Sequence, residues 1–359
     1  MAAGEPYLHY QPSGPVSTEY RVGLCAWQDR SMIEDGSFYP ARTMTAEDRL
    51  RWYARFFDCV EVNSTFYAPL SARNAVLWAQ RTPPGFLFSV KAYALLTGHH
   101  LDAGRLPDPL LAMLPASARP NARGQLENQL FPAEARAWLF ATFREALIPL
   151  IDEGKLGYVL FQMAPWFRFH AAALAYLERL PAELPGVTIA VEFRDSSWLP
   201  GHTEETLSFL AARGLTYVSV DAPSTPAMVA SALALTSEVA VLRLHGRNAP
   251  GFLKQLRGGQ PSVAEKYGYL YDQEELAGIA TRLRRLDGHA RRVYVKMNNN
   301  VTDAPAINGG QIRELLGQET ADREAVAAEW RTRRTRSGGR GRRRASAGEP
   351  VGPEEPLRL

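Results

Sequence analysis

Residues 59–92, CVEVNSTFYAPLSARNAVLWAQRTPPGFLFSVKA, carry the clearest structural pattern in the chain. They predict a short apolar strand that contains Glu61, a loop, a helix, and a second apolar strand at Phe86–Val90 that is followed by Lys91. The Pro-Pro-Gly at 83–85 ends the helix, because proline cannot continue it. Two strands of buried type that each bring a charged residue to the same end are typical of an α/β barrel or a doubly wound sheet.

The same alternation of apolar runs with helical segments continues on both sides of this stretch. Most of the runs are continuously apolar, as expected for parallel strands that are covered on both faces. Eight βα units in about 300 residues favour a TIM (β/α)8-type barrel over a doubly wound sheet. The expected strands are residues 20–25, 60–62, 86–90, 157–161, 187–191, 215–220, 239–242 and 292–297.

Composition divides the 359 residues into one α/β domain with a flanking segment at each end. Residues 1–19 are rich in Pro, Gly and Ser and predict a flexible N-terminal arm, whereas residues 20–320 predict the barrel. Within the barrel, residues 95–132 hold several prolines and predict a long loop or lid. Residues 321–359 are rich in Arg, Gly, Ser, Pro and Glu without apolar periodicity, which predicts a disordered tail.

The formal charge of +3 hides an asymmetry between the body of the chain and its tail. Nine arginines against three glutamates give residues 331–359 a net charge of +6, which leaves −3 for the rest. The whole-chain charge therefore says little about the partners of the barrel.

Cysteine usage and hydropathy bear on the cellular compartment. Cys25 and Cys59 have no metal-ligand spacing, and no apolar run approaches the ~20 residues of a membrane span. The N-terminal residues lack the basic and apolar regions of a signal peptide. These features predict a cytoplasmic protein with reduced thiols and no membrane contact.

Polar or aromatic side chains stand at the carboxyl ends of the expected strands, where a TIM barrel has its active site. Carboxylates and an imidazole could transfer protons there, and basic side chains could hold a phosphate or carboxylate group. For each residue alone, a solvated strand end or a structural ion pair is the alternative. The candidate catalytic residues are Glu61, Lys91, Glu192, Asp221 and His245. The candidate substrate-binding residues are Trp27, Asn63, Tyr67, Gln162, Arg194, Trp198, Arg243, Asn298 and Asn299.

A divalent metal is considered and not predicted. Glu61, Glu192, Asp221 and His245 could ligate Mn²⁺, Mg²⁺ or Zn²⁺ if they converge, but the chain has no HxH, HExxH or CxxC pattern. The neighbouring lysine and arginines supply positive charge themselves, so we predict no cofactor. The absence of GxGxxG after a strand, GxxxxGK[ST] and GxSxG argues against a P-loop and an α/β-hydrolase triad.

Several motifs together carry a family resemblance. FYP at 38–40, EVNSTFY at 61–67, EFR at 192–194, RLHGR at 243–247 and the Asn pair at 298–299 resemble the YecE-like family, the domain of unknown function 72. The resemblance spans about Tyr20 to Leu316 and implies a TIM-barrel fold. It adds Tyr269, inside the matching segment 267–271, to the candidate substrate-binding residues. The family has no established activity, so the resemblance implies no reaction.

The chain departs from the family pattern at a few positions. Leu24–Ala26 stand where a Thr-Ser-Gly-like turn is common, and Asp195 stands where a histidine often follows Arg194. The Asp195 difference leaves no histidine role at that position.

Three functions are compatible with these observations. The first is an enzyme or ligand binder with a polar pocket for a small anionic molecule, such as a phosphorylated or sugar-like compound. The second is a metal-dependent hydrolase or isomerase, which could act on nucleic acid. The third is a nucleic-acid-binding or adaptor protein that uses the tail, where residues 331–344 hold eight arginines and no acid. A solubilising role is the alternative for that tail.

Overall fold

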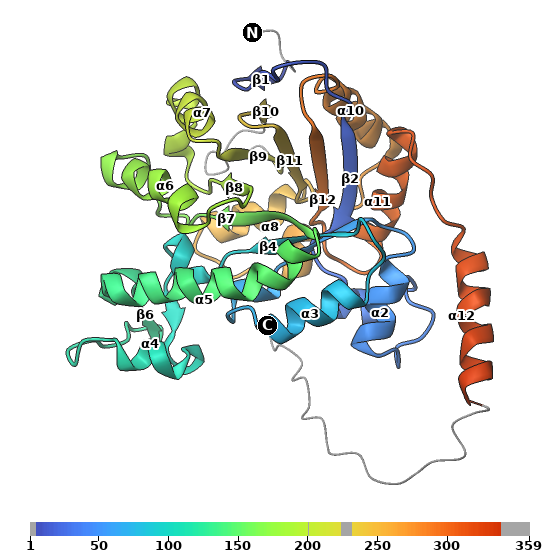
Figure 1. Ribbon diagram of the computed structural model, residues 1–359, viewed down its shortest axis with the longest axis horizontal. Coiled ribbons are helices and arrows are strands. Elements are labelled where there is room, and N and C mark those ends of the chain that lie inside the picture. Colours follow the sequence, from blue (N-terminus) through green and yellow to red (C-terminus); the bar gives the residue numbers. More distant parts are fainter. Residues whose placement is uncertain (1–4, 200, 224–231, 339–359) are drawn as a thin grey trace. The chain divides into compact units, whose positions relative to one another are not determined.

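Eight parallel strands close into a barrel, which confirms the TIM-type α/β fold (Figure 1). The computed structural model describes residues 5–199, 201–223 and 232–338. Each of the eight strands expected from the sequence is a barrel strand. In order around the barrel they are β2 (Glu19–Leu24), β3 (Cys59–Val62), β4 (Leu87–Lys91), β7 (Leu156–Gln162), β8 (Ile189–Glu192), β9 (Thr216–Asp221), β11 (Val239–Leu244) and β12 (Arg292–Met297).

Helices alternate with the barrel strands along the chain. Neighbouring helices such as α3 and α5, or α10 and α11, pack against each other. The helices are α1 (Arg30–Glu34), α2 (Ala46–Tyr53), α3 (Ala72–Gln80), α4 (Asp108–Ala112), α5 (Ala133–Asp152), α6 (Ala171–Glu183), α7 (Thr203–Ala212), α8 (Ala249–Leu256), α9 (Val263–Tyr267), α10 (Gln273–Arg284), α11 (Ala304–Leu315) and α12 (Arg323–Gly338). Among the described residues, no helix is long and apolar enough to cross a membrane.

Local sequence explains where individual elements begin and end. Thr45 caps α2 in a capping box with Asp48, which satisfies backbone N–H groups that have no partner within the helix. The last turn of α3 is held by Lys155, whose Nζ donates to the carbonyl oxygens of Ala79 at 2.6 Å and Thr82 at 2.7 Å. Because Lys155 immediately precedes β7, this contact fixes the C-terminus of α3 against the start of that strand.

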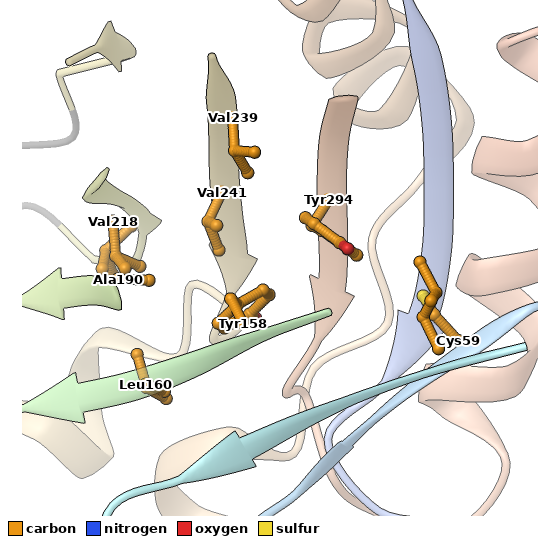
Figure 2. Close-up of a cluster of buried hydrophobic side chains, with 10 residues drawn as sticks. Cys59, Tyr158, Leu160, Ala190, Val218, Val239, Val241 and Tyr294 are labelled. Atoms are coloured by element: carbon orange, nitrogen blue, oxygen red, sulfur yellow. The ribbon is translucent and has the colours of Figure 1, made fainter. Parts of the chain in front are cut away.

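The barrel interior is a continuous core to which seven of the eight strands contribute side chains (Figure 2). The remaining strand, β2, approaches β3 closely at Gly23, where a Cβ atom would lie only 2.0 Å from the carbonyl oxygen of Cys59. A larger residue at Gly23 would therefore separate the two strands. The cluster consists of Cys59, Leu87, Tyr158, Leu160, Ala190, Val218, Val220, Val239, Val241 and Tyr294.

Two segments that we expected to lack regular structure contain short elements. In the expected N-terminal arm, β1 (Tyr7–Leu8) pairs in parallel with β10 (Ala234–Leu235), so the prediction of a flexible arm was wrong for that part. The expected loop at 95–132 contains α4 and an antiparallel pair, β5 (Leu101–Asp102) with β6 (Gln125–Leu126). Both pairs join residues that are distant in sequence, which local patterns do not reveal. The lid role of 95–132 stays a prediction.

Part of the expected disordered tail is helical. The barrel unit ends at Gln318, and the second compact unit includes α12. The Asp322 carboxylate accepts a hydrogen bond from the Glu324 N–H at 2.8 Å and so caps this helix. Alanine, glutamate and arginine then supply good helix formers without an apolar stripe, which explains why periodicity alone missed α12. Residues 339–359 lie outside the described residues.

Candidate functional site at the carboxyl ends of the barrel strands

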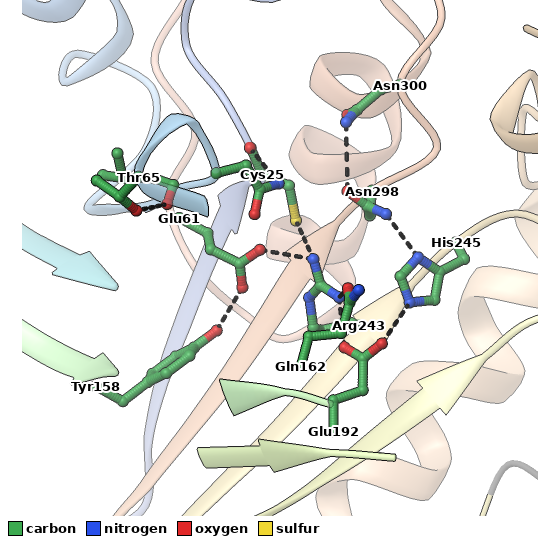
Figure 3. A network of polar contacts seen from close by, with 12 residues as sticks. Cys25, Glu61, Thr65, Tyr158, Gln162, Glu192, Arg243, His245, Asn298 and Asn300 are labelled. Carbon is green, nitrogen blue, oxygen red and sulfur yellow. Dashed lines mark hydrogen bonds and ion pairs between the residues drawn. The ribbon is translucent and has the colours of Figure 1, made fainter. Parts of the chain in front are cut away.

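A buried arginine links two carboxylates from different strands inside the barrel (Figure 3). Arg243, near the end of β11, is 1% exposed, and Glu61 of β3 and Glu192 of β8 are fully buried. Arg243 Nη2 lies 2.7 Å from Glu61 Oε1, while Nη1 donates to Glu192 Oε2. Tyr158 of β7 also donates from its hydroxyl to Glu61 Oε2 at 3.0 Å. Three sequence-predicted residues therefore meet in one network.

The charges of this network keep both carboxylates ionised. Burial alone would raise the pKa of Glu61, but the positive charges of Arg243 and Lys296 outweigh it and lower that pKa. Burial is likewise outweighed at Glu192, where Arg194 and Arg243 hold the pKa well below its usual range. Neither carboxylate is therefore suited to take up a proton near neutral pH.

Lys91 lies at the end of β4 beside this network and is 8% exposed. Its Nζ sits 4.1 Å from the centre of the Phe66 ring. Within the described part of the chain, Lys91 Nζ makes no hydrogen bond or ion pair. Burial, reinforced by the charge of Arg243, lowers the pKa of Lys91 to about 7. An amine in this state can accept or release a proton near neutral pH.

Arg194, Gln162 and His245 form the next layer of the site. Arg194 follows β8, and its Nε lies 2.5 Å from Glu192 Oε1. Its Nη2 donates to Gln162 Oε1 at 3.0 Å and lies 3.3 Å from His245 Nε2. The other ring nitrogen of His245 faces Asn298 Nδ2 at 2.6 Å. The structure thus brings these four predicted residues together with Glu192.

His245 differs from its expected behaviour. We expected an imidazole that titrates near neutrality, but burial and the charge of Arg194 lower the pKa of His245 to about 4. The ring is therefore neutral at pH 7 and serves as a hydrogen-bonding group.

Asp221 is placed in a separate network. Its carboxylate accepts two hydrogen bonds from Arg247, at 2.8 Å from Nε and 2.7 Å from Nη2, and one from the Tyr271 hydroxyl at 3.0 Å. Arg282 Nη2 lies 3.4 Å from the same carboxylate. The His245 N–H donates to the Asp221 carbonyl at 2.9 Å, but the Asp221 carboxylate contacts Arg247, Tyr271 and Arg282 and none of the other predicted catalytic side chains in the described part of the chain.

Two predicted substrate-binding residues belong to the surroundings of the Asp221 network. Tyr269 donates from its hydroxyl to Glu275 at 2.7 Å, and Glu275 also pairs with Arg247 at 2.8 Å. Asn299 is fully buried, and its Nδ2 donates to the Tyr269 carbonyl at 2.8 Å. These contacts join the segment that precedes α10 to the loop that follows β12.

The predicted aromatic residues have different locations. Trp198 is fully buried, stacks on Phe193 with ring centres 4.0 Å apart, and is a core residue rather than a binding surface. Trp27 is 6% exposed and packs edge-on against Trp78. Tyr67 is 41% exposed and contacts the ring of Phe66 edge-on, which places it next to the Lys91 site.

The amide nitrogen of Asn63 connects the ends of two strands and does not face Lys91. Its Nδ2 donates to the Cys25 carbonyl at 2.9 Å and joins the ends of β2 and β3. Both cysteines are free thiols, as the sequence analysis expected, and both are buried. Among the described side chains, no group of three or more His, Cys, Asp and Glu is arranged to hold a metal ion.

Two polar residues of the barrel interior were missed by sequence reasoning. Tyr158 donates to Glu61, and Lys296 Nζ lies 2.9 Å from Cys59 Sγ. Strand alternation could have found both, because each lies an even number of residues from another inward-facing position on its own strand.

A third missed residue, His99, lies in a loop. It follows the 3₁₀ turn at 94–97, and burial together with the charge of Lys91 lowers the pKa of His99 to about 3. A loop residue of this kind has no periodicity to reveal it.

Comparison with known proteins gives one family. The family model described as "Protein of unknown function DUF72" matches residues 21–332. The UPF0759 protein YunF of Bacillus subtilis (strain 168) is 34% identical over 301 residues, which cover 83% of this chain and 95% of that protein.

Solved structures agree with the fold. A crystal structure of a DUF72 family protein from Enterococcus faecalis V583 is similar with a TM-score of 0.66 at 23% identity, covering 85% of this chain and 98% of that one. A DUF72 family protein from Thermotoga maritima MSB8 is similar with a TM-score of 0.61 at 27% identity, covering 85% of this chain and 100% of that one.

Proposed function

The chain belongs to the DUF72 family, and we propose that it is an enzyme or small-ligand binder that takes a small anion beside Lys91 and Arg194 at the carboxyl ends of β4 and β8. The anionic group would be a phosphate or a carboxylate. The observation that carries this proposal is Lys91, a buried amine that no described carboxylate pairs with.

The balance of charge around Lys91 favours an anion. The site holds two buried carboxylates, Glu61 and Glu192, and Arg243 already bonds both of them. Arg194 and Lys296 add further positive charge close to these carboxylates, and Lys91 adds another when it is protonated. Basic groups in excess over carboxylates, inside a barrel of low dielectric constant, attract a negatively charged ligand strongly.

Each residue then has a distinct role. Lys91 and Arg194 would contact the anion, since Arg194 offers a planar guanidinium that is 15% exposed. Arg243, Glu61 and Glu192 would keep the floor of the site rigid, and neutral His245 would hydrogen-bond the ligand or its neighbours. In an enzyme, Lys91 would be the group that exchanges a proton with the substrate.

Sulfate titration of the purified full-length protein tests this function. Sulfate keeps its charge across neutral pH, so changes in its dissociation constant report the protein. We expect Lys91→Gln and Arg194→Gln each to weaken sulfate binding by about 10- to 100-fold, because each removes a charge-assisted hydrogen bond of roughly 1.5–3 kcal/mol. Arg179→Gln is the matched control, since Arg179 is 70% exposed on α6. Equal affinity in all variants at fixed ionic strength would refute the site.

The pH dependence has a defined sign. The pKa of Lys91 is lowered to about 7, so its charge is present below that pH and lost above it. Sulfate affinity in the wild type should therefore fall by up to about tenfold per pH unit as the pH rises above 7. His245 and His99, with pKa values lowered to about 4 and about 3, do not titrate in this range. Lys91→Gln should remove the pH dependence.

A second function is supported by the arginines of the tail. Residues 331–344 include eight arginines and no acid, and Gly338–Arg342 read GGRGR. Such a segment suits the phosphate backbone of RNA without base preference. This activity would be independent of the Lys91 site.

A further inference from the structure

We propose that Lys91 is a covalent nucleophile that forms an imine with the carbonyl carbon of an aldehyde or oxo acid that also bears a phosphate or carboxylate group. The inference rests on the proposed function, because the anionic group would be held beside the amine. It goes beyond that function by naming a reaction intermediate and the carbonyl class of substrate.

The position of the amine supports a nucleophilic role. Lys91 is 8% exposed, and Thr65 fixes its backbone by donating to the Lys91 carbonyl at 2.6 Å. The Nζ atom rests against the Phe66 ring at 4.1 Å and makes no hydrogen bond or ion pair with any described residue. Its lone pair is therefore not engaged by another group of the described chain.

The other buried lysines show what a structural lysine looks like in this barrel. The chain has five lysines, at 91, 155, 254, 266 and 296. Lys155 Nζ is within 3.0 Å of three oxygen atoms, from Ala79 and Thr82, and Lys296 Nζ contacts Cys59 Sγ at 2.9 Å. Among the described residues, Lys91 has no such partners. An arginine at 91 would supply charge as well, but it could not lose a proton, so a lysine is the residue that nucleophilic chemistry requires.

Neighbouring charges keep a large fraction of this amine neutral. The charged and titratable groups that act on Lys91 are Arg243, Glu192, Arg194, Glu61 and His99. Burial is the largest cause that lowers the pKa of Lys91, and the charges of the two arginines add to it, so that this pKa falls to about 7. Both carboxylates are at the same time paired with arginines. A desolvated lysine next to cationic groups is an established way to activate an amine for imine formation.

The covalent step balances without an added oxidant or reductant. The lone pair of neutral Lys91 Nζ forms a C–N bond to the carbonyl carbon, and the C=O π electrons move to oxygen, which takes a proton that the nitrogen releases. The C–O bond then breaks as the nitrogen lone pair forms the C=N bond, and the oxygen leaves as water with the second proton. Arg194 would hold the carboxylate or phosphate of the same molecule.

Borohydride trapping tests the proposal directly. The full-length protein is incubated at pH 7.5 with glyoxylate, pyruvate or glyceraldehyde 3-phosphate and reduced with sodium borohydride. Hydride adds to the imine carbon and gives a stable secondary amine, which intact-mass and peptide mass spectrometry locate. We expect one adduct per chain on the peptide that carries Lys91. Labelling of Lys91 should be much faster than labelling of Lys254, whose Nζ is held by Glu265 Oε1 at 2.7 Å.

Controls separate specific from general reactivity. Lys91→Arg should lose the adduct, and Lys254→Arg, at a half-exposed lysine paired with Glu265, should keep it. Sulfate should compete with the anionic probes, and glyceraldehyde without phosphate should react more slowly. If Lys91→Arg unfolds, the wild-type peptide map still decides, since it reads the site of the adduct without a variant.

Each contrary outcome identifies which idea fails. Sulfate binding that depends on Lys91, without an adduct from any of the three probes, would overturn the imine and leave the proposed anion site standing. Neither sulfate binding nor an adduct would overturn both. Labelling of Lys254 and Lys266 at the same rate as Lys91 would show ordinary surface reactivity and overturn the inference.

Discussion

A single arginine sets the electrostatics of the barrel interior. Arg243 is the common partner of Glu61 and Glu192, and all three side chains are essentially shielded from water. Burying charges costs more than a single ion pair usually returns, so such a triad has value mainly as a device that fixes geometry. Here it holds the ends of β3, β8 and β11 in one arrangement beside Lys91.

Replacing Arg243 alone should destabilise the protein strongly. Arg243→Met leaves two buried carboxylates without their partner, and we expect a loss of about 3–5 kcal/mol in the free energy of unfolding, measured by urea denaturation. The matched control is the triple variant Arg243→Met, Glu61→Gln, Glu192→Gln, which removes the charges together and should recover much of the loss. If the triple variant is as unstable as the single one, poorer packing rather than unpaired charge is the cause.

At the scale of the element, the alternation of side chains along each strand decides which of the predicted residues point into the barrel. Ala190 and Val241 lie in the interior cluster, so Glu192 and Arg243, two residues further on, also point inward. Val218 and Val220 are interior on β9, which turns the next residue, Asp221, outward. Its carboxylate accordingly joins the loop after β11 to Tyr271 and to α10.

Asp221→Asn therefore separates a structural role from a site role. The substitution removes charge from a carboxylate that three side chains contact, and we expect the free energy of unfolding to fall by about 1–3 kcal/mol. Sulfate affinity should stay at the wild-type value, in contrast to Arg194→Gln. Calorimetric titration measures the sulfate affinity, and urea denaturation measures the free energy of unfolding. A large loss of sulfate affinity without loss of stability would show that Asp221 belongs to the anion site after all.

The same alternation of side chains explains which features the sequence could predict and which it could not. Continuous apolar runs located all eight barrel strands, because strands covered on both faces need such runs. The strand ends were located too, and with them Glu61, Lys91, Glu192 and Arg243. Which face each end residue occupies required the interior register, so Asp221 was grouped with the catalytic candidates. Trp198 was misplaced for a related reason, since an aromatic residue after a strand can as well fill the core.

At the scale of the whole molecule, long-range pairing and bulk composition limit prediction. The pairing of β1 with β10 joins residues more than 200 positions apart, and no local pattern near Tyr7 announces it. In the tail, composition without an apolar stripe predicted disorder, although the good helix formers that follow Asp322 build α12. What composition does establish for the tail is its charge.

That charge leads to a prediction about nucleic acid. In the full-length protein, replacing Arg340, Arg342, Arg343 and Arg344 with Gln should weaken binding to a single-stranded poly-U oligonucleotide. The slope of log affinity against log salt should become shallower by ~0.7 for each phosphate that the variant no longer neutralises. The matched control replaces four exposed arginines of the barrel unit, Arg73, Arg105, Arg119 and Arg123, and should leave the slope unchanged. Fluorescence anisotropy across a salt series measures both proteins. Identical slopes in the two variants would mean that the tail does not bind RNA. Sulfate binding at Lys91 should be the same in both variants, because the two activities use different arginines.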